Sequence, residues 1–276
     1  MCGIQHKIEM PWQPTTIRRA DKVFSTATET VRVTTDAGPG YLKALGNRGG
    51  PQYLAADWFG TQLAVWLGLP TFEFAIIQVT PEDEIAFKNA TAQPGPAFIT
   101  REVSGMVWSG AANELDLLIN PEDIGKLVLF DTWTRNCDRH PPDLSQRKVN
   151  RNNVFLSNEG MPDGKFQLVA MDHTHCFNCG RDLNAHLAHI DLVKDDRLYG
   201  LFPEFRAFIK PHWQTLLNAV IRLQTLDKTW VLERVAAIPA EWQVDAAARA
   251  ALAMQVCDRA DYLGETFIAL LEPNLV

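Results

Sequence analysis

The sequence contains no hydrophobic run long enough to cross a membrane. None of its apolar stretches approaches the roughly 18 residues of a membrane span, and residues 1–7 lack the apolar core of a signal peptide. Positive charge is also scarce: the formal net charge is −7, so there is no overall basic surface for binding nucleic acid. We therefore expect a protein that binds neither a membrane nor nucleic acid directly.

Cysteine is scarce too, and the odd number of thiols is most simply explained by a reduced, cytoplasmic protein. The five residues are Cys2, Cys137, Cys176, Cys179 and Cys257. Two of them form the pair Cys176-x-x-Cys179 beside His173 and His175, which resembles part of a zinc site. No second pair follows at a useful spacing, and Cys137 is the one nearby candidate. A zinc site and a set of buried thiols both remain open interpretations.

The sequence also lacks internal repeats and low-complexity tracts. Its 46% hydrophobic and 21% charged residues are ordinary for a globular protein. A chain of 276 residues suits one large domain or two small lobes, and either can bury a substantial core.

Before residue 104 the pattern predicts mostly strands with one helix. An irregular lead-in over residues 1–22 precedes a hairpin, whose alternating strand at 31–35 returns at 41–45 and carries Lys43. Apolar residues at helical intervals predict a helix over 52–67, which Gly68 ends. Further strands are expected at 72–79 and 97–100. Residues 1–103 are therefore interpreted as one lobe.

After residue 104 helices dominate, and residues 104–276 are interpreted as the second lobe. The segment Asn120-Pro121-Glu122-Asp123 predicts a helix start with a capping Asn. Two short strands are expected at 153–156 and 166–171. Residues 199–271 predict at least three helices, with Asp227 capping one and a long alanine-rich helix over 245–271.

Three short oxygen-bearing side chains stand at the ends of regular elements: Asp138 after a helix, Asn153 before a strand and Asp172 after a strand. Such a set can hold Mg²⁺ and orient a hydroxyl at a phosphate. Asp138 could accept the proton of an attacking hydroxyl, and His140 could bond the loop backbone or the phosphate. The alternative for Asp138 is a solvated helix-terminal turn, and for Asn153 an ordinary turn residue.

Two residues of the first lobe could support the same chemistry. Lys43 lies inside a strand near a turn, from which it could reach an ATP phosphate, although a solvent-facing lysine is the plainer interpretation. Asp57 lies on the helix that follows and could pair with Lys43, or could be an ordinary surface acid.

The ordered segments Asn136-Cys137-Asp138-Arg139-His140, then Asn153, then Met171-Asp172-His173 resemble those of the HipA-like kinases. They resemble more distantly the phosphoinositide kinases, whose catalytic loop reads Asp-Arg-His-x-x-Asn. Residues 41–43 are similar to the family's lysine strand, and residues 54–58 and 67–70 to the helix that follows it. The resemblance covers roughly residues 20–210.

The resemblance implies an α+β, two-lobed protein-kinase-like fold, with a small mainly β N-lobe, a larger mainly helical C-lobe and ATP in the cleft. It implies a kinase that uses ATP and Mg²⁺ to phosphorylate a hydroxyl, on a Ser or Thr of an unidentified protein. It also implies an antitoxin-like partner. The implied catalytic residues are Asp138 and His140, and the implied Mg²⁺ ligands are Asn153 and Asp172.

The resemblance also implies a nucleotide site. Lys43 would contact the ATP phosphates with Asp57 as its partner, and the hinge Arg101-Glu102-Val103 would meet adenine through its backbone. The sequence departs from the family pattern at several points. Asp57 stands where a Glu is usual, and no glycine-rich loop precedes Lys43, although residues 25–28 could serve through hydroxyls and backbone N–H groups.

A further departure concerns the metal ligand. The Asn expected three residues after His140 is Asp143, so the role is assigned to Asn153 after a loop insertion, while Asn152 and Asp143 compete for it. Two other functions remain open. One is a metal-dependent hydrolase that uses Asp138, His140, Asp172 and His173. The other is a catalytically inactive kinase-like module that binds a nucleotide or a partner.

Overall fold

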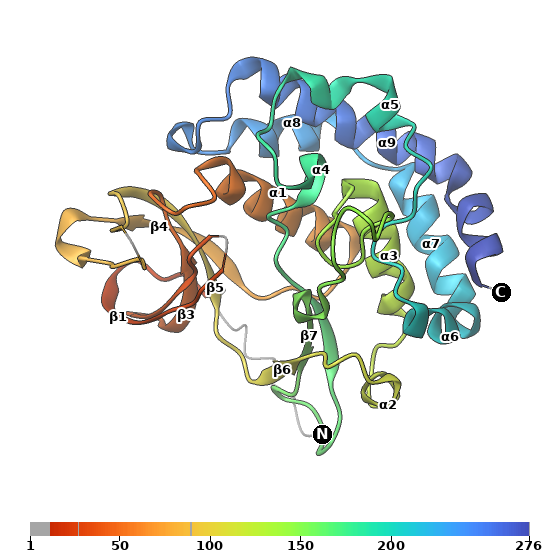
Figure 1. Cartoon of the computed structure of the whole chain (residues 1–276), viewed down its shortest axis with the longest axis horizontal. Helices are drawn as coiled ribbons and strands as arrows, with labels where there is room; N and C mark the ends of the chain where they lie inside the picture. The colour runs from red at the N-terminus through yellow and green to blue at the C-terminus, as the bar shows by residue number, and fades with distance from the viewer. Residues whose placement is uncertain (1–11, 27, 89, 276) are drawn as a thin grey trace, which may run out of the picture. The chain divides into compact units, whose positions relative to one another are not determined.

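The chain divides into two units in this computed structural model, which describes residues 12–26, 28–88 and 90–275 (Figure 1). The first unit comprises Met1–Arg48 and Glu73–Glu102, and the second comprises Gly49–Phe72 and Val103–Val276. The predicted boundary placed residues 49–72 in the first lobe. They group with the second unit because their helix packs against other helices of that unit. Within the described residues, no helix is both long and apolar enough to span a membrane.

The first unit is built on a five-stranded antiparallel sheet with the strand order β1-β2-β3-β5-β4. Its strands are β1 (Ile17–Val23), β2 (Val31–Thr35), β3 (Gly38–Lys43), β4 (Phe74–Val79) and β5 (Gly95–Arg101). Alternation in β2 places Val31 and Val33 in the core, where they join Leu42, Ile77 and Ile99. The predicted hairpin is confirmed, and Lys43 is the last residue of its second strand.

The predicted irregular lead-in over residues 1–22 is wrong for its last part, because Ile17–Val23 forms β1. Residues 1–11 of that prediction lie outside the described residues. The strand was missed because it is an edge strand, in which only Ile17 is buried and charged side chains face outward. Its sequence therefore shows no apolar alternation.

Helices make up most of the second unit. The longer ones are α1 (Gln52–Leu67), α3 (Asp123–Thr134), α7 (Trp213–Leu223), α8 (Lys228–Ala236) and α9 (Ala246–Leu271). The short ones are α2 (Ala112–Leu115), α4 (Cys176–Cys179), α5 (Ile190–Val193) and α6 (Arg206–Ile209). Helix α9 packs against α3, α7 and α8, as its neighbouring ribbons in Figure 1 show. The predicted helix over 52–67 and its stop at Gly68, which has a φ of 80°, are confirmed.

The predicted starts of α8 and α9 are confirmed, whereas the predicted start of α3 is wrong. Asp227 and Asp245 cap α8 and α9 by accepting the backbone N–H of Thr229 and Ala248. The predicted start at Asn120 is wrong, because α3 begins at Asp123 without a side-chain cap. The Asn120 side chain instead accepts the N–H of Leu168 and so joins the start of α3 to a strand.

A second, three-stranded antiparallel sheet carries Asn153 and Asp172 next to its strand ends. It is formed by β6 (Gly105–Val107), β7 (Val154–Ser157) and β8 (Gln167–Ala170) in that order, and the sequence did not indicate β6. Val154 pairs with Ala170. Because the strands are antiparallel, the start of β7 lies beside the end of β8. Asn153 and Met171, the residues just outside this pair, are therefore brought to the same edge of the sheet.

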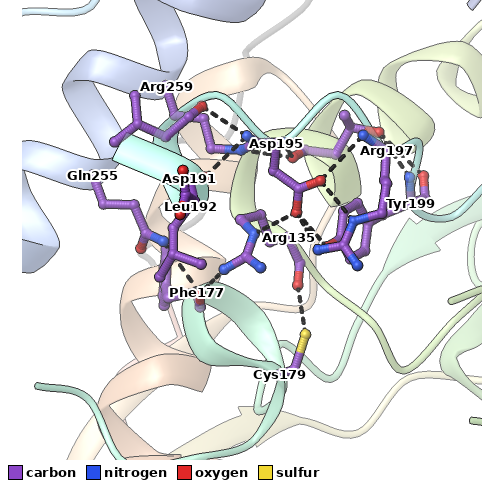
Figure 2. Close-up of polar contacts among 12 residues, drawn as sticks. Arg135, Phe177, Cys179, Asp191, Leu192, Asp195, Arg197, Tyr199, Gln255 and Arg259 are labelled. Atoms are coloured by element: carbon purple, nitrogen blue, oxygen red, sulfur yellow. Dashed lines mark hydrogen bonds and ion pairs between the residues drawn. The ribbon is translucent and has the colours of Figure 1, made fainter. Parts of the chain in front are cut away.

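A buried carboxylate, Asp195, ties the end of α3 to the segment that leads toward α6 (Figure 2). It accepts hydrogen bonds from Arg135 Nε at 3.0 Å, from Arg197 Nε at 2.7 Å and from the Tyr199 hydroxyl at 2.7 Å. Burial opposes ionisation, but these hydrogen bonds outweigh it and hold the pKa of Asp195 well below its usual range. Arg259 of α9 extends the network by donating to the Thr132 carbonyl at 2.7 Å.

Candidate active site

Asp138 lies in a turn that the end of α3 and the Asn136 side chain fix together. Helix α3 ends at Arg135, which adopts a left-handed conformation with a φ of 53°. The fully buried Asn136 then donates to Asp131 Oδ1 at 3.0 Å and accepts the N–H of Asp138 at 3.2 Å. The turn is therefore built from side-chain bonds to the backbone, and it presents Asp138 beyond the helix.

The Asp138 carboxylate is where several chain segments meet. Its Oδ2 accepts Asn153 Nδ2 at 2.8 Å and Asn150 Nδ2 at 3.2 Å, and lies 3.6 Å from His175 Nδ1. The Asp138 side chain is 24% exposed, so it is held in place but remains accessible. Asn150 and His175 were not selected from the sequence. The run of asparagines at 150–153 was the signal, but the sequence alone did not separate their roles.

The structure places Asn153, and not the two competing residues, against the catalytic turn with its side chain buried. Asp143 instead folds back on its own loop, where it accepts the N–H and hydroxyl of Ser145 and the amide of Gln146. Asn152 is exposed.

Hydrogen bonds to the backbone of Met171 and His173, the residues before and after it, fix the position of Asp172. It directly follows Met171 at the end of β8 and has a φ of 53°, a left-handed conformation that is uncommon for a residue with a Cβ. The Met171 carbonyl accepts Arg139 Nη2 at 2.9 Å, and the Asp57 carboxylate of α1 accepts the N–H of His173 at 2.8 Å. Asp172 Oδ1 accepts the hydroxyl of Thr174 at 2.8 Å.

Beneath these residues lies a fully buried ion pair between Arg139 and Asp131. Arg139 Nη1 donates to Asp131 Oδ1 at 3.2 Å, and both side chains are 0% exposed. Burial raises the pKa of Asp131 to about 6, although Arg139 opposes the shift by favouring the charged carboxylate. Arg139 therefore neutralises a buried charge and also positions the segment that carries Asp172.

His173 packs against Gly60 of α1, where no side chain larger than hydrogen fits. A Cβ on Gly60 would lie 2.6 Å from the Cβ of His173, so we expect Gly60→Ala to lower the free energy of unfolding. Overpacking of this kind costs about 1–3 kcal/mol, which outweighs the gain of about 1 kcal/mol in helix propensity. Urea unfolding measures the change. Gly125→Ala in α3 is the matched control, because its Cβ would meet Leu216 at an ordinary 3.6 Å. Equal responses of the two variants would contradict the expected clash.

His140 follows Arg139 in the sequence but has different neighbours. Its ring meets Phe202 edge-on with the centroids 5.3 Å apart, and its carbonyl accepts the N–H of Gly200 at 2.9 Å. Partial burial, helped by the charge of Arg151, lowers the pKa of His140. These contacts indicate that His140 holds the loop in position.

The candidate nucleotide-binding residues fall in both units: Lys43, Arg101 and Glu102 in the first, Asp57 and Val103 in the second. Glu102 accepts Arg32 Nη2 at 2.7 Å and the Tyr41 hydroxyl at 3.1 Å, and the bond from Arg32 is the main reason that its pKa is lowered. Arg101 pairs with Glu73 at 2.5 Å. The N–H groups of Arg101 and Glu102 donate to the backbone carbonyls of Glu73 and Pro39.

The metal-binding alternatives gain no support from the described residues. Residues 12–26, 28–88 and 90–275 contain no group of three or more His, Cys, Asp or Glu side chains that could hold a metal ion. Cys176 is buried and donates to Thr134 Oγ1 at 3.4 Å, whereas Cys179 faces the Arg135 carbonyl at 3.6 Å. His173, which the hydrolase hypothesis requires, is 1% exposed.

Comparison with known proteins agrees with this geometry. A family model described as HipA-like kinase matches residues 35–261. Among solved structures, the chain is similar to the Helicobacter pylori proinflammatory kinase CtkA, with a TM-score of 0.56 and 12% identity over 95% of this chain and 98% of that one. At this identity the likeness concerns the fold. No curated protein matches the chain.

Proposed function

Because the chain belongs to the HipA-like kinase family, we propose that it transfers the γ-phosphoryl group of ATP to a hydroxyl, on a Ser or Thr of a protein. The observation that carries the proposal is that Asn153 donates a hydrogen bond to Asp138. The pairing of β7 with β8 brings the strand end before Asp172 beside the strand start after Asn153. Phosphoryl transfer requires a base and oxygen ligands for the metal, and we propose these three residues for those roles.

Asp138 is proposed as the residue that accepts the proton of the attacking hydroxyl. Its contacts with Asn150, Asn153 and His175 are all made to Oδ2. We assign Oδ1 to the acceptor hydroxyl, because a carboxylate whose other oxygen is fixed presents one lone pair in a defined direction. His140 positions the loop rather than moving the proton.

The residues present fit a Mg²⁺ ion that is carried largely by nucleotide phosphates. Asn153 uses its amide nitrogen on Asp138, which reserves its amide oxygen for the metal, and Asp172 supplies a carboxylate. Mg²⁺ prefers oxygen ligands and commonly takes only one or two from the protein when phosphates supply others. When bound, the ion would neutralise charge on the transferring phosphate.

Nucleotide binding is proposed to use the residues implied by the family pattern. Lys43 would contact the phosphates. Asp57, which accepts the His173 N–H through Oδ1, is proposed as the acidic partner that the family pattern assigns to the lysine. The Arg101-Glu102-Val103 backbone would meet adenine. Residues 25–28 would cover the phosphates, although residue 27 lies outside the described residues.

We expect ATP with Mg²⁺ to raise the melting temperature of the protein, and EDTA to remove the increase. At an ATP concentration 100 times its Kd the stabilisation is about 2.7 kcal/mol. Asp172→Asn is expected to lose the dependence on Mg²⁺, and Asp143→Asn, whose carboxylate bonds only its own loop among the described contacts, serves as the matched control. Labelled ATP with candidate proteins tests transfer. Binding without transfer would favour an inactive nucleotide-binding module, and no binding would overturn the proposal.

The acceptor protein remains unidentified, and an antitoxin-like partner stays a prediction. The basic loop around Arg147 and Lys148 is next to the catalytic turn in sequence. Assaying transfer to proteins that co-purify with the chain tests both questions.

A further inference from the structure

Two cysteines line one pocket beside the catalytic turn. The pocket has a volume of about 240 Å³ and is lined by Cys137 and Cys179 together with several arginines. Cys137 directly precedes Asp138, whereas Cys179 ends α4, in the segment that leads away from Asp172. A bond between the two sulfurs would therefore join the two segments that hold the proposed base and metal ligand.

Cys137 and Cys179 share this pocket, and each thiol is the largest influence on the pKa of the other. This pairing differs from the Cys-x-x-Cys pair visible in the sequence, because Cys176 is 1% exposed and donates to Thr134. Cys137 is 3% exposed, and Cys179 is the more exposed member. A reagent that enters the pocket therefore meets Cys179 first, with Cys137 immediately behind it.

The surroundings of Cys179 favour a thiolate. The Cys137 thiol lowers the pKa of Cys179 to about 7, and the guanidinium groups of Arg135, Arg147 and Arg197 add to the effect. Figure 2 shows the Cys179 sulfur directed at the Arg135 carbonyl oxygen, to which the thiol donates at 3.6 Å, while Asp195 holds the Arg135 guanidinium. Arg147 also donates to the Cys179 carbonyl at 2.6 Å. Cys179, with burial, raises the pKa of Cys137, so that thiol stays protonated.

We propose that Cys137 and Cys179 form an oxidation site that a peroxide converts to a disulfide. The Cys179 thiolate attacks hydrogen peroxide, an S–O bond forms, the O–O bond breaks and hydroxide leaves, which a proton converts to water. Cys137 then attacks the sulfenic sulfur through its own sulfur. The S–S bond forms, the S–O bond breaks, and the Cys137 proton leaves with the hydroxyl as a second water. The two sulfurs are oxidised, and the peroxide is reduced.

The consequence for phosphoryl transfer rests on the proposed function. A disulfide draws its sulfurs to about 2.05 Å, closer than any hydrogen-bonded contact, so at least one of the two segments must move. Asp138 directly follows Cys137. A displacement of about 1 Å in a catalytic group can cost about 100-fold in rate. Oxidation is therefore expected to switch the transfer off, and a dithiol reductant to restore it.

Mass spectrometry of the peroxide-treated full chain tests the chemistry without any kinase assay. After alkylation of the remaining thiols, we expect a peptide cross-linked through Cys137 and Cys179 that dithiothreitol releases. Cys137→Ser is expected to accumulate a Cys179 sulfenic acid that dimedone traps, whereas the control variants Cys176→Ser and Cys257→Ser should form the cross-link normally. Linkage of Cys179 to Cys176, Cys257 or Cys2, or no cross-link at all, overturns the proposal.

A transfer assay tests the regulatory consequence separately. We expect peroxide to lower transfer by up to about 100-fold in the unmodified chain, but to leave Cys179→Ser unaffected. Equal loss in Cys179→Ser, or full activity in a chain shown to be cross-linked, would overturn the switch. A chain that shows no transfer even when reduced would contradict the proposed function, while the cross-link would still decide the thiol chemistry.

Discussion

Replacing Asp138 by Asn is expected to lower phosphoryl transfer by roughly 10²–10⁴-fold, the usual contribution of a positioned general base. The change removes the charge and the proton-accepting lone pair but keeps the shape of the side chain. The amide oxygen can still accept the bonds from Asn150 and Asn153, so the turn should hold. Steady-state transfer from labelled ATP measures the loss, and thermal unfolding verifies that the fold survives.

Asp143→Asn is the matched control for this variant. Asp143 is also a carboxylate of the catalytic segment, but its oxygens bond Ser145 and Gln146. It is expected to keep transfer within a few-fold of the unmodified chain, on the order of what a surface change produces. If Asp143→Asn lost transfer and Asp138→Asn kept it, the assignment of the base would be wrong.

Replacing Arg139 by Met is expected to lower the free energy of unfolding by about 3–5 kcal/mol, the cost of breaking a buried ion pair from one side. Asp131 would be left in the core without its partner, and both side chains are 0% exposed. The pKa of Asp131, already raised to about 6 by burial, would rise further once the opposing cation is gone. The loss should therefore be largest at neutral pH and smaller in mild acid, where the carboxyl group is protonated.

A double-mutant cycle separates this charge effect from simple loss of packing. Asp131→Asn in the Arg139→Met background removes the stranded charge, so the double variant should be more stable than Arg139→Met alone. Arg139→Lys should rescue only part of the stability, because one ammonium cannot match the fork that bonds both Asp131 and the Met171 carbonyl. Urea unfolding at neutral pH compares the unmodified chain with Asp131→Asn, Arg139→Met, Arg139→Lys and the double variant. Strict additivity would show that the pair is not coupled.

The Asp138 and Arg139 variants test two different roles in the same site. Asp138 is proposed to touch the substrate, whereas Arg139 acts through the residues that it holds in place. Arg139 joins the helix that ends before the catalytic turn to the strand end that carries Asp172. Loss of Arg139 should therefore also reduce transfer, in proportion to the loosening of the Asp172 segment.

The sequence by itself determined the elements whose signals are local. The hairpin with Lys43, the helix closed by Gly68, the cap at Asp227 and the long helix after Asp245 depend on contacts within a few residues, and the structure confirms them. The order of the catalytic segments was likewise sufficient to indicate the kinase family. Edge strand β1 was missed because its exposed faces carry charge rather than an apolar pattern.

Only the tertiary structure decided which side chains meet. Asn153 rather than Asp143 reaches Asp138 because an antiparallel strand pair fixes the start of β7 beside the end of β8. Cys179 shares a pocket with Cys137, whereas its sequence neighbour Cys176 bonds Thr134, because the contacts of Cys179 and Arg135 set the position of the segment. Local spacing limits what one segment can do, whereas contacts between distant segments depend on packing that no short stretch of sequence encodes.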